Sequence, residues 1–265
     1  MKKLLSVEKT MLFLLSKVKQ MGAQQFVEIY EQRGYTSTYI RNALSRLKKE
    51  GYIASPARSW YNVTAEGLAY IKAINSKPAR YQEQWDHTWD VVMLEVPESE
   101  RKKRDLFRTA LGQLGYGLLY NSVYISPWNY QDEVAAQIQK LELEGKVSIL
   151  QGQFQEGTIT PLKARAIWQL DDIEALYQKK SVWLKEEFAP RLADTLQAGQ
   201  PLQLFLLYLQ MGEELSGLFM ADPYLPDELL PDHWPGKRVL SDMREYMVRA
   251  AQAIPADSSY APFVQ

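Results

Sequence analysis

The sequence predicts an α+β protein of several domains, and three stretches of the 265-residue chain carry this prediction. Residues 1–78 show three short helical patterns followed by a hairpin pattern, which is the order of a winged helix-turn-helix. Residues 85–158 follow the order strand, helix, strand, strand, helix, strand, which is typical of a ferredoxin-like βαββαβ domain. Residues 160–265 show mainly helical patterns, so we expect a mostly helical C-terminal domain there.

Composition excludes several classes of protein. The chain has no cysteine, which rules out a disulfide framework, thiol catalysis and a thiolate metal site. The longest apolar run, Leu204–Leu209, is far shorter than the roughly 20 residues of a membrane span. The basic and then apolar start has no small-residue cleavage site after it. We therefore expect a cytoplasmic protein that has no membrane partner.

The charges are divided unevenly along the chain. Residues 1–80 carry 14 Lys and Arg against five Asp and Glu, which gives a net charge of +9. The remainder carries 17 basic and 27 acidic residues, a net charge of −10. A basic N-terminal region on an acidic body indicates a polyanionic partner for that region alone.

Helical spacing places three helices in the basic region. The first has a periodic set of apolar residues, namely Val7, Met11, Leu14, Leu15 and Val18. Gly22 breaks the chain before a short second helix that ends near Gly34. The third helix begins at the capping residues Thr36 and Ser37 and stops before Gly51, a residue type suited to a helix C-terminus.

The third helix has two contrasting faces. Its apolar stripe consists of Ile40, Ala43, Leu44 and Leu47. The other side carries polar and basic residues and has no acid before Glu50, although an ordinary solvated face mixes both signs of charge. We expect DNA contacts from this side, namely Thr38, Arg41, Asn42, Ser45, Arg46, Lys48 and Lys49.

A hairpin pattern follows at residues 52–63, with its expected turn at residues 56–59 and Arg58 at the tip. Thr64 can cap a further helix that runs to about Asn75. Helices, hairpin and helix in this order predict that the third helix lies in the major groove of double-stranded DNA, with Arg58 close to the backbone or the adjacent minor groove. The alternative is a basic three-helix domain that has another purpose.

The body is predicted element by element. The expected strands and helices are strand 88–96, helix 98–114, strand 116–119, strand 123–126, helix 130–144 and strand 147–151. Helical patterns continue in the C-terminal region, where residues 202–218 and 239–254 are strongly apolar. A proline-rich segment, residues 222–236, separates these two helices, and we expect poor order after Pro255.

Several short strings together resemble the PaaX family of phenylacetate-degradation repressors. The N-terminal region contains Ile40-Arg41-Asn42-Ala43-Leu44-Ser45-Arg46-Leu47, followed by Glu50-Gly51-Tyr52. The body contains Trp85-Asp86, Trp89, Val96-Pro97-Glu98, Gly115-Tyr116-Gly117 and Ile125-Ser126-Pro127. The most specific strings are Leu225-Pro226-Asp227-Glu228-Leu229-Leu230-Pro231 and Trp234-Pro235-Gly236. One departure is His87, which stands where the family usually has glycine.

The resemblance covers nearly the whole chain in the expected order. It implies a dimeric, cytoplasmic transcriptional repressor of an aromatic-acid catabolic operon that an acyl-CoA such as phenylacetyl-CoA releases from operator DNA. It also implies that the central domain is similar to the small ferredoxin-like nuclease subunit of CRISPR systems. Repression and release by an acyl-CoA follow from the resemblance alone, and the sequence names neither the operator nor the exact effector.

The residues themselves give little support to catalysis, to a metal or to a bound cofactor. Asp86, His87 and Asp90 are close in sequence, but a solvated turn before a strand explains them. Glu95 occupies roughly the place of a metal carboxylate in the nuclease-like relatives, yet one carboxylate cannot build a two-metal site. We therefore predict a protein that is not an enzyme, with no catalytic and no metal-binding residues.

Three arginines, Arg101, Arg104 and Arg108, share one face of a predicted helix. They can bind the phosphates of an acyl-CoA effector or of DNA. They can equally pair with nearby acids such as Glu98 and Asp105.

Three classes of function remain. The first is a ligand-responsive repressor that binds operator DNA as a homodimer. The second is a metal-dependent, nucleic-acid-processing enzyme built on the central domain. The third is a DNA-binding protein without an effector. Metal-dependent cleavage would favour the second class, and footprints that no acyl-CoA disturbs would favour the third.

Overall fold

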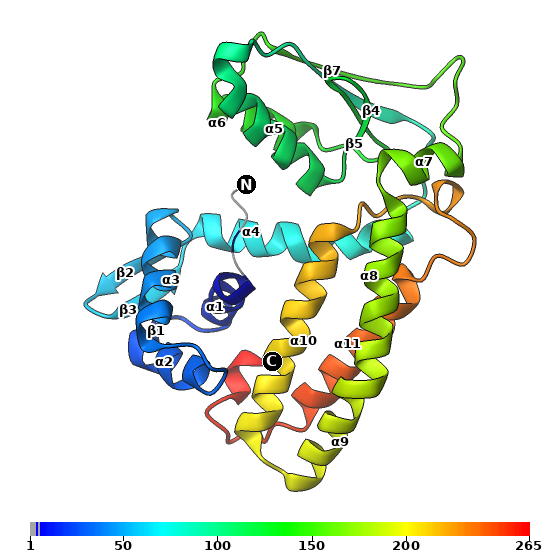
Figure 1. Ribbon diagram of the computed structural model, residues 1–265. Coiled ribbons are helices and arrows are strands. Elements are labelled where there is room, and N and C mark those ends of the chain that lie inside the picture. Colours follow the sequence, from blue (N-terminus) through cyan, green and yellow to red (C-terminus); the bar gives the residue numbers. More distant parts are fainter. Residues whose placement is uncertain (1–3, 5) are drawn as a thin grey trace. The chain divides into compact units, whose positions relative to one another are not determined.

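The computed structural model describes Leu4 and residues 6–265, and these fall into two units. Unit 1 consists of residues 77–177 and 220–237, whereas unit 2 consists of residues 4–76, 178–219 and 238–265. Lys2 and Lys3 of the predicted basic region lie outside the described residues. Both helices and antiparallel sheets are present, so the predicted α+β class is confirmed (Figure 1).

The two units do not follow the predicted order of domains along the chain. Unit 2 combines the predicted N-terminal domain with most of the predicted C-terminal one. The boundaries 1–78, 85–158 and 160–265 stay a prediction. Among the described residues, no helix is both long and apolar enough to cross a membrane.

The N-terminal part of unit 2 contains four helices and a three-stranded antiparallel sheet. The helices are α1 (Ser6–Lys17), α2 (Ala23–Glu31), α3 (Ser37–Lys49) and α4 (Ala65–Ser76). The strands are β1 (Met21–Gly22), β2 (Ile53–Ala57) and β3 (Trp60–Val63), in the order β1-β3-β2.

Local capping sets the ends of α3. The Thr36 hydroxyl accepts a hydrogen bond from the Tyr39 backbone N–H at 3.2 Å, which satisfies a free donor of the first turn. Gly51 adopts φ +82° directly after the helix, a conformation that favours glycine. Ile40, Ala43, Leu44 and Leu47 are fully buried, so the predicted apolar stripe is confirmed.

The hairpin differs from the prediction in its turn. Pro56 and Ala57 belong to β2, and Ala57 pairs with Trp60, so the tip consists of Arg58 and Ser59 alone. Pro56 is tolerated because β2 lies at the edge of its sheet. Strand β1 was not predicted, because two residues carry no alternating pattern.

Gly67 explains how closely α4 approaches the hairpin. A Cβ atom at this position would lie 2.3 Å from the Tyr52 carbonyl oxygen and 2.9 Å from a Val63 methyl carbon. Only glycine therefore lets the first turn of α4 pack against the base of the hairpin.

The C-terminal part of unit 2 is helical. It contains the end of α8 (Leu170–Trp183), a π-helical turn (Leu184–Phe188), α9 (Ala189–Ala198), most of α10 (Pro201–Ala221) and most of α11 (Gly236–Gln252). The expectation of poor order after Pro255 is wrong. Phe263 is 7% exposed, and the rings of Phe263 and Tyr260 both pack on Phe205 of α10.

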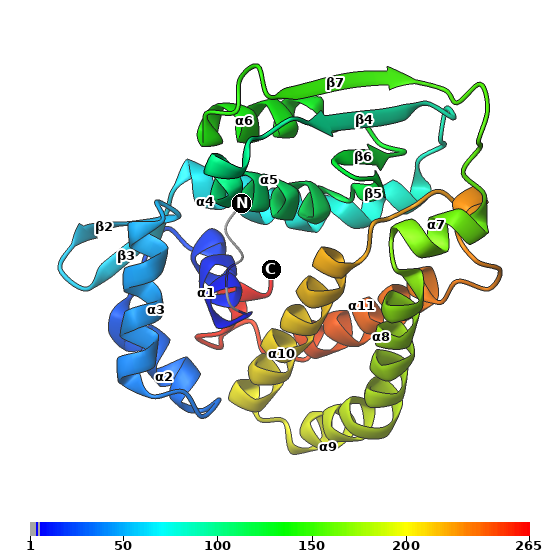
Figure 2. The ribbon, with the colours of Figure 1, turned by 45° about the horizontal axis from the view of Figure 1, so that its top comes forward.

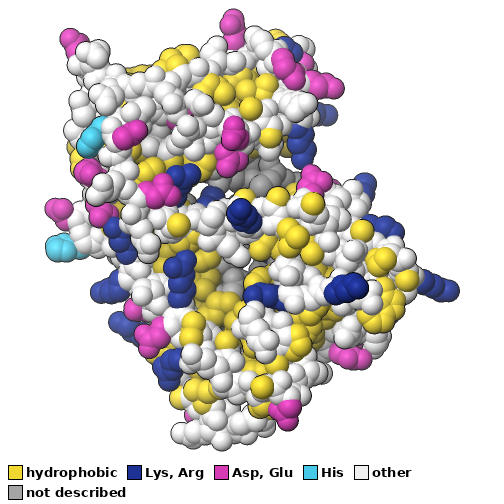
Figure 3. Space-filling model, turned by 180° about the vertical axis from the view of Figure 1, so that it is seen from behind, with side chains coloured by type: hydrophobic (Ala, Val, Ile, Leu, Met, Phe, Trp, Pro, Cys, Tyr) yellow, Lys and Arg dark blue, Asp and Glu magenta, His cyan; other side chains and the backbone are white. Residues whose placement is uncertain are grey.

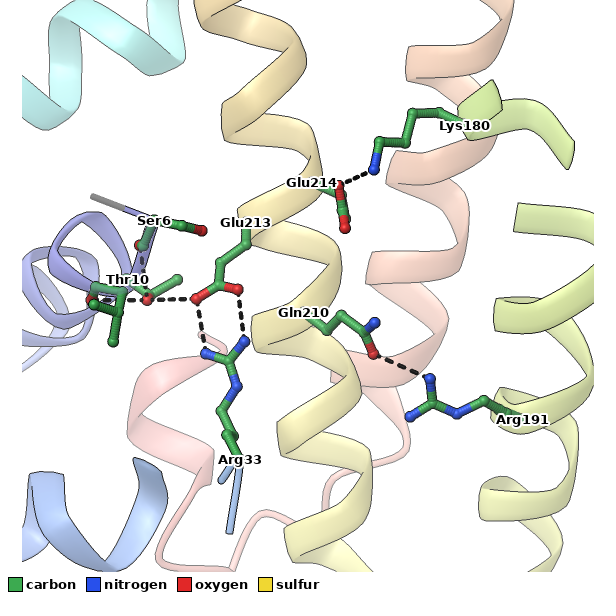
Figure 4. Close-up of polar contacts among 9 residues, drawn as sticks. Ser6, Thr10, Arg33, Lys180, Arg191, Gln210, Glu213 and Glu214 are labelled. Carbon is green, nitrogen blue, oxygen red and sulfur yellow. Dashed lines mark hydrogen bonds and ion pairs between the residues drawn. The ribbon is translucent and has the colours of Figure 1, made fainter. Parts of the chain in front are cut away.

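A half-buried ion pair joins the N-terminal helices of unit 2 to α10. The Arg33 guanidinium, in the turn between α2 and α3, donates two hydrogen bonds to the Glu213 carboxylate at 2.8 and 2.6 Å (Figure 4). The Thr10 hydroxyl of α1 donates to the same carboxylate at 2.9 Å. Both charged side chains are 12% exposed. Burial alone would lower the pKa of Arg33, but the bonds to Glu213 raise it overall.

Unit 1 is built on a four-stranded antiparallel sheet. Its elements in chain order are β4 (Trp89–Leu94), α5 (Arg101–Leu114), β5 (Gly117–Tyr120), β6 (Val123–Ser126), α6 (Gln131–Leu141) and β7 (Val147–Gly152). The strand order is β5-β6-β4-β7, with α5 and α6 on one face (Figure 2). The predicted order of strands and helices in this region is confirmed, with ends that differ by up to three residues.

Both faces of this sheet carry a hydrophobic core. Val92, Tyr124 and Phe107 belong to the core that includes α5 and α6. Trp89 and Ile125 face the opposite way, against α7 (Pro161–Ile167) and the proline-rich segment 222–236. His87, ahead of β4, adopts φ 61°, a left-handed conformation that glycine adopts with less strain than other residues.

Asp222 organises the proline-rich segment. Its buried carboxylate accepts hydrogen bonds from the Tyr81 and Tyr177 hydroxyls and from the Tyr224 backbone N–H. The Trp234 indole donates to the Tyr81 hydroxyl at 2.8 Å and extends the network. Burial raises the pKa of Asp222, whereas the bonds from the two tyrosines oppose that shift.

We expect Asp222→Ala to destabilise unit 1 by about 3 kcal/mol, because it leaves two buried hydroxyls and one N–H without their acceptor. Urea denaturation followed by tryptophan fluorescence measures this loss. Asp232→Ala is the control, since Asp232 is exposed in the same segment and its loss should change stability by less than about 0.5 kcal/mol. Equal effects of the two variants would contradict the role of Asp222.

We expect Arg33→Met to destabilise unit 2 by about 3 kcal/mol, because Glu213 would remain buried without its countercharge. The double variant Arg33→Met/Glu213→Met should recover much of this loss, since it removes both charges. Thermal and urea denaturation of the single and double variants measure the coupling. Arg191→Met is the control, because the exposed Arg191 side chain lies 3.4 Å from Gln210 and pairs with no acid there. Additive effects of the two substitutions would contradict the ion pair.

Candidate nucleic-acid interface

The exposed face of α3 consists of polar and basic side chains. Thr38, Arg41, Asn42, Ser45, Lys48 and Lys49 are all exposed, opposite the buried stripe. No Asp or Glu occurs within Ser37–Lys49. The face therefore offers many hydrogen-bond donors and a positive charge, which suits phosphates and the acceptor atoms of base edges.

Arg46 differs from its neighbours on this face. Its Nε donates to the Glu8 carboxylate at 2.5 Å, and the guanidinium lies 5.8 Å from the Tyr39 ring centroid. The Arg46 side chain is 46% exposed, whereas that of Glu8 is 5% exposed. Its position in the sequence predicts a DNA contact like those of its neighbours, but in the structure Arg46 has an internal partner on α1. Glu8 could have indicated this pair in the sequence, because it is an acidic residue among the apolar residues of α1 and therefore needs a basic partner.

The hairpin presents a second set of exposed side chains. Arg58 is exposed at the tip between β2 and β3. Trp60, the first residue of β3, is 41% exposed, which is unusual for so large an apolar side chain. Sequence reasoning did not single out Trp60. Lys and Arg side chains project from the hairpin edge of the N-terminal region, at the right of Figure 3.

The position of α3 depends on contacts outside it. Arg33 lies in the segment between α2 and α3, and its bonds to Glu213 tie this segment to α10. The Glu8–Arg46 pair ties the middle of α3 to α1. Two ion pairs thus fix the helix whose exposed face is the candidate interface.

The three arginines of the predicted effector site lie on α5, in unit 1. Arg101 is 67% exposed and lies 3.6 Å from Glu98 and 3.7 Å from Asp105. Arg104 donates to Glu98 at 3.0 Å. Arg108 is exposed further along the same helix. Arg101 and Arg104 therefore pair with Glu98 and Asp105, the alternative partners that the sequence offers, and the effector role stays a prediction.

Asp86 and Asp90, which the sequence offered as possible metal ligands, accept hydrogen bonds from other residues of the chain. Asp90 is 1% exposed and accepts a hydrogen bond from the Tyr116 hydroxyl across the core. The Asp86 carboxylate accepts from the Thr88 N–H at 2.8 Å and so closes a turn. In the described part of the chain, no group of three or more His, Cys, Asp or Glu side chains is placed to hold a metal ion.

Two family models match the central and C-terminal parts of the chain. Residues 82–164 match the PaaX protein central Cas2-like domain, and residues 168–256 match the PaaX-like protein C-terminal domain. The transcriptional repressor PaaX of Escherichia coli (strain K12) is 26% identical over 215 residues, which cover 78% of this chain and 67% of that protein.

Among solved structures, an uncharacterized protein from Mycobacterium tuberculosis is similar to this chain. It is 19% identical with a TM-score of 0.49, and the match covers 88% of this chain and 89% of that one.

The two domain matches lie in the family's order and together span most of the chain outside the N-terminal region. The chain belongs to the PaaX family.

Proposed function

We propose that this protein is a DNA-binding transcriptional repressor of an aromatic-acid catabolic operon, with phenylacetate as the pathway substrate. The observation that carries the proposal is the exposed face of α3, which holds basic and polar side chains and no acid. The similarity to a repressor from Escherichia coli supports a regulator and not an enzyme.

In this proposal residues 4–76 act as a winged helix-turn-helix. Helix α3 lies in the major groove, where Thr38, Arg41, Asn42 and Ser45 read base edges. Lys48 and Lys49 contact phosphates, and Arg58 contacts the backbone beside the groove. Arg46 keeps one donor on Glu8 and offers its remaining donors to DNA.

In this proposal the sheet domain of unit 1 acts as a ferredoxin-like scaffold. The strand order β5-β6-β4-β7, with both helices on one face, supports that description. A nucleic-acid-processing enzyme is the second candidate, but the exposed Glu95 at the end of β4 is a single carboxylate and would need a second one to hold two metal ions. An effector-independent DNA-binding protein is the third.

The proposed repressor acts as a homodimer on operator DNA. One winged helix contacts too few base pairs for tight, specific binding at physiological salt. Two copies would read half-sites separated by about 10–10.5 bp or a multiple of that spacing.

The proposed effector is an acyl-CoA such as phenylacetyl-CoA. To release the operator, it must bind the DNA-incompetent arrangement better than the DNA-bound one, and DNA must in turn weaken its binding. Arg101, Arg104 and Arg108 are the proposed phosphate contacts, with Glu98 and Asp105 as competitors that the phosphates displace.

We expect Arg41→Ala to weaken operator binding by about 1–3 kcal/mol and to relax specificity at one base position. Lys49→Ala should weaken all sequences alike and reduce the salt slope by roughly one. Titrations against operator and scrambled duplex at several salt concentrations measure both effects. Lys185→Ala, an exposed substitution in the C-terminal helices, is the control. Wild-type affinity in both interface variants would contradict the placement of α3 in the groove.

We expect phenylacetyl-CoA to bind the free protein about 100-fold more tightly than the operator complex, a coupling of about 2.7 kcal/mol. Calorimetry with and without operator measures this difference. Replacing Arg101, Arg104 and Arg108 together by Gln should abolish release and leave operator binding intact, whereas Lys140→Gln on α6 should change neither. Equally tight binding with and without DNA would show that the molecule is not an inducer.

A further inference from the structure

We propose that a pocket in unit 1 binds a small methylated ammonium, such as a quaternary amine, between aromatic rings and one carboxylate. The pocket lies where the turn before β4, the segment after β7 and the short helical turn Asp227–Leu229 meet. All of its described lining residues belong to unit 1. The inference goes beyond the proposed function, because these residues include none of the proposed contacts with DNA or with an acyl-CoA.

The walls of the pocket are largely aromatic. The rings that line it are those of Trp85, His87, Trp89 and Phe154. The Trp89 ring meets the Trp85 ring at 76° with centroids 4.9 Å apart, and it meets the Phe154 ring at 63° with centroids 6.0 Å apart. Rings at such steep angles form adjoining walls and not one flat surface. Proteins surround quaternary ammonium groups with walls of this kind, because the faces of aromatic rings carry partial negative charge.

The turn before β4 holds the first of these rings in place. The Trp85 indole N–H donates to the Thr88 carbonyl oxygen at 3.1 Å, and the Thr88 N–H donates to the Asp86 carboxylate at 2.8 Å. The ring of His87, inside this turn, has its centroid 4.8 Å from that of Trp85. The walls are therefore ordered before a ligand binds, which lowers the entropic cost of binding.

The charges at the pocket favour a cation. Glu228 is the only acid among the described lining residues, and none of these residues is Lys or Arg. The Glu228 side chain is exposed and, within the described part of the chain, has no ion-pair partner. The neighbouring Asp227 differs, because the Lys237 Nζ lies 2.7 Å from its carboxylate. The Glu228 carboxylate can therefore neutralise a bound cation.

Arg80 is the basic residue that lies beside this site. It lines a second, more polar hollow that shares Trp85 and Glu228 with the pocket. The Arg80 guanidinium lies 2.6 Å from the Glu83 carboxylate and 5.5 Å from the centroid of the Trp128 ring. Arg80 thus has its own acidic and aromatic partners, and it forms no ion pair with Glu228.

Size and hydration select the kind of ammonium. The volume of the pocket is about 310 Å³. An apolar cavity of roughly 150 Å³ holds benzene, so the pocket has room for a trimethylammonium group and a short chain. A primary ammonium suits it less, because aromatic walls leave most of its three N–H donors without acceptors. A quaternary ammonium has no such donors, and its methyl groups can contact the ring faces directly.

The test titrates the full-length protein with choline and with its neutral isostere, in which a tert-butyl group replaces the trimethylammonium group. Calorimetry and tryptophan fluorescence measure binding at about pH 8, where a histidine side chain is ordinarily neutral. We expect choline to bind at least about tenfold more tightly than the isostere and at least about tenfold more tightly than ethanolamine. Equal affinities for choline and the isostere would overturn the proposal, because they would show a site that ignores charge.

Glu228→Gln should weaken choline binding about tenfold and reduce its salt dependence, while binding of the neutral isostere stays the same. Asp232→Asn is the matched control, because Asp232 is exposed in the same proline-rich segment and does not line the pocket. Equal effects of these two substitutions on choline binding would contradict a contact with Glu228. Since Glu228 is exposed, we expect the melting temperature of Glu228→Gln to equal that of the wild type.

Phe154→Leu removes one aromatic wall but keeps an apolar side chain, so it should weaken choline binding about fivefold and binding of the isostere less. Tyr120→Leu is the matched control, because Tyr120 is 66% exposed and lies outside the pocket. Wild-type affinity for choline in Phe154→Leu would overturn the aromatic site, as would the absence of choline binding to the wild type at millimolar concentration. None of these outcomes depends on whether the protein binds DNA.

Discussion

The half-buried ion pair between Arg33 and Glu213 is the interaction on which the arrangement of unit 2 depends. It connects residues that are 180 positions apart, from the α2–α3 segment to the middle of α10. Two hydrogen bonds from a planar guanidinium fix the orientation as well as the distance of the two side chains. Removing one partner leaves a charge with little access to water, so the pair constrains both regions together. The Thr10 bond adds α1 to the same cluster.

This link gives a physical route from the C-terminal helices to the candidate DNA interface. Helix α10 is held on one side by Thr10 and Arg33 and on another by the Lys180–Glu214 pair (Figure 4). The face of α3 has no acid of its own to compete for its cations. A change in the position of α10 would therefore alter how α3 is held without altering the exposed face of α3 itself.

In unit 1, hydrogen bonds to a single buried carboxylate hold the proline-rich segment in place. Residues 222–235 have little regular structure, and their position depends on one buried carboxylate with two tyrosine hydroxyls as donors. The Trp128 indole also donates to the Tyr224 carbonyl oxygen at 2.6 Å, which ties the segment to the central sheet domain. The strings that carry the family resemblance, around Leu225 and Trp234, lie in this segment. Leu225, Leu229 and Leu230 of these strings are buried in the hydrophobic core that also contains Trp89 and Ile125 of the sheet.

The sequence by itself determined the features that repeat over a few residues. The buried stripe of α3, its exposed basic side and the order of strands and helices in residues 89–152 follow from local periodicity and capping, which a single segment carries. Only the tertiary structure decided which distant groups meet. The Glu8 partner of Arg46, the Glu213 partner of Arg33 and the packing of Phe263 on Phe205 depend on how helices pack, and no local pattern encodes that.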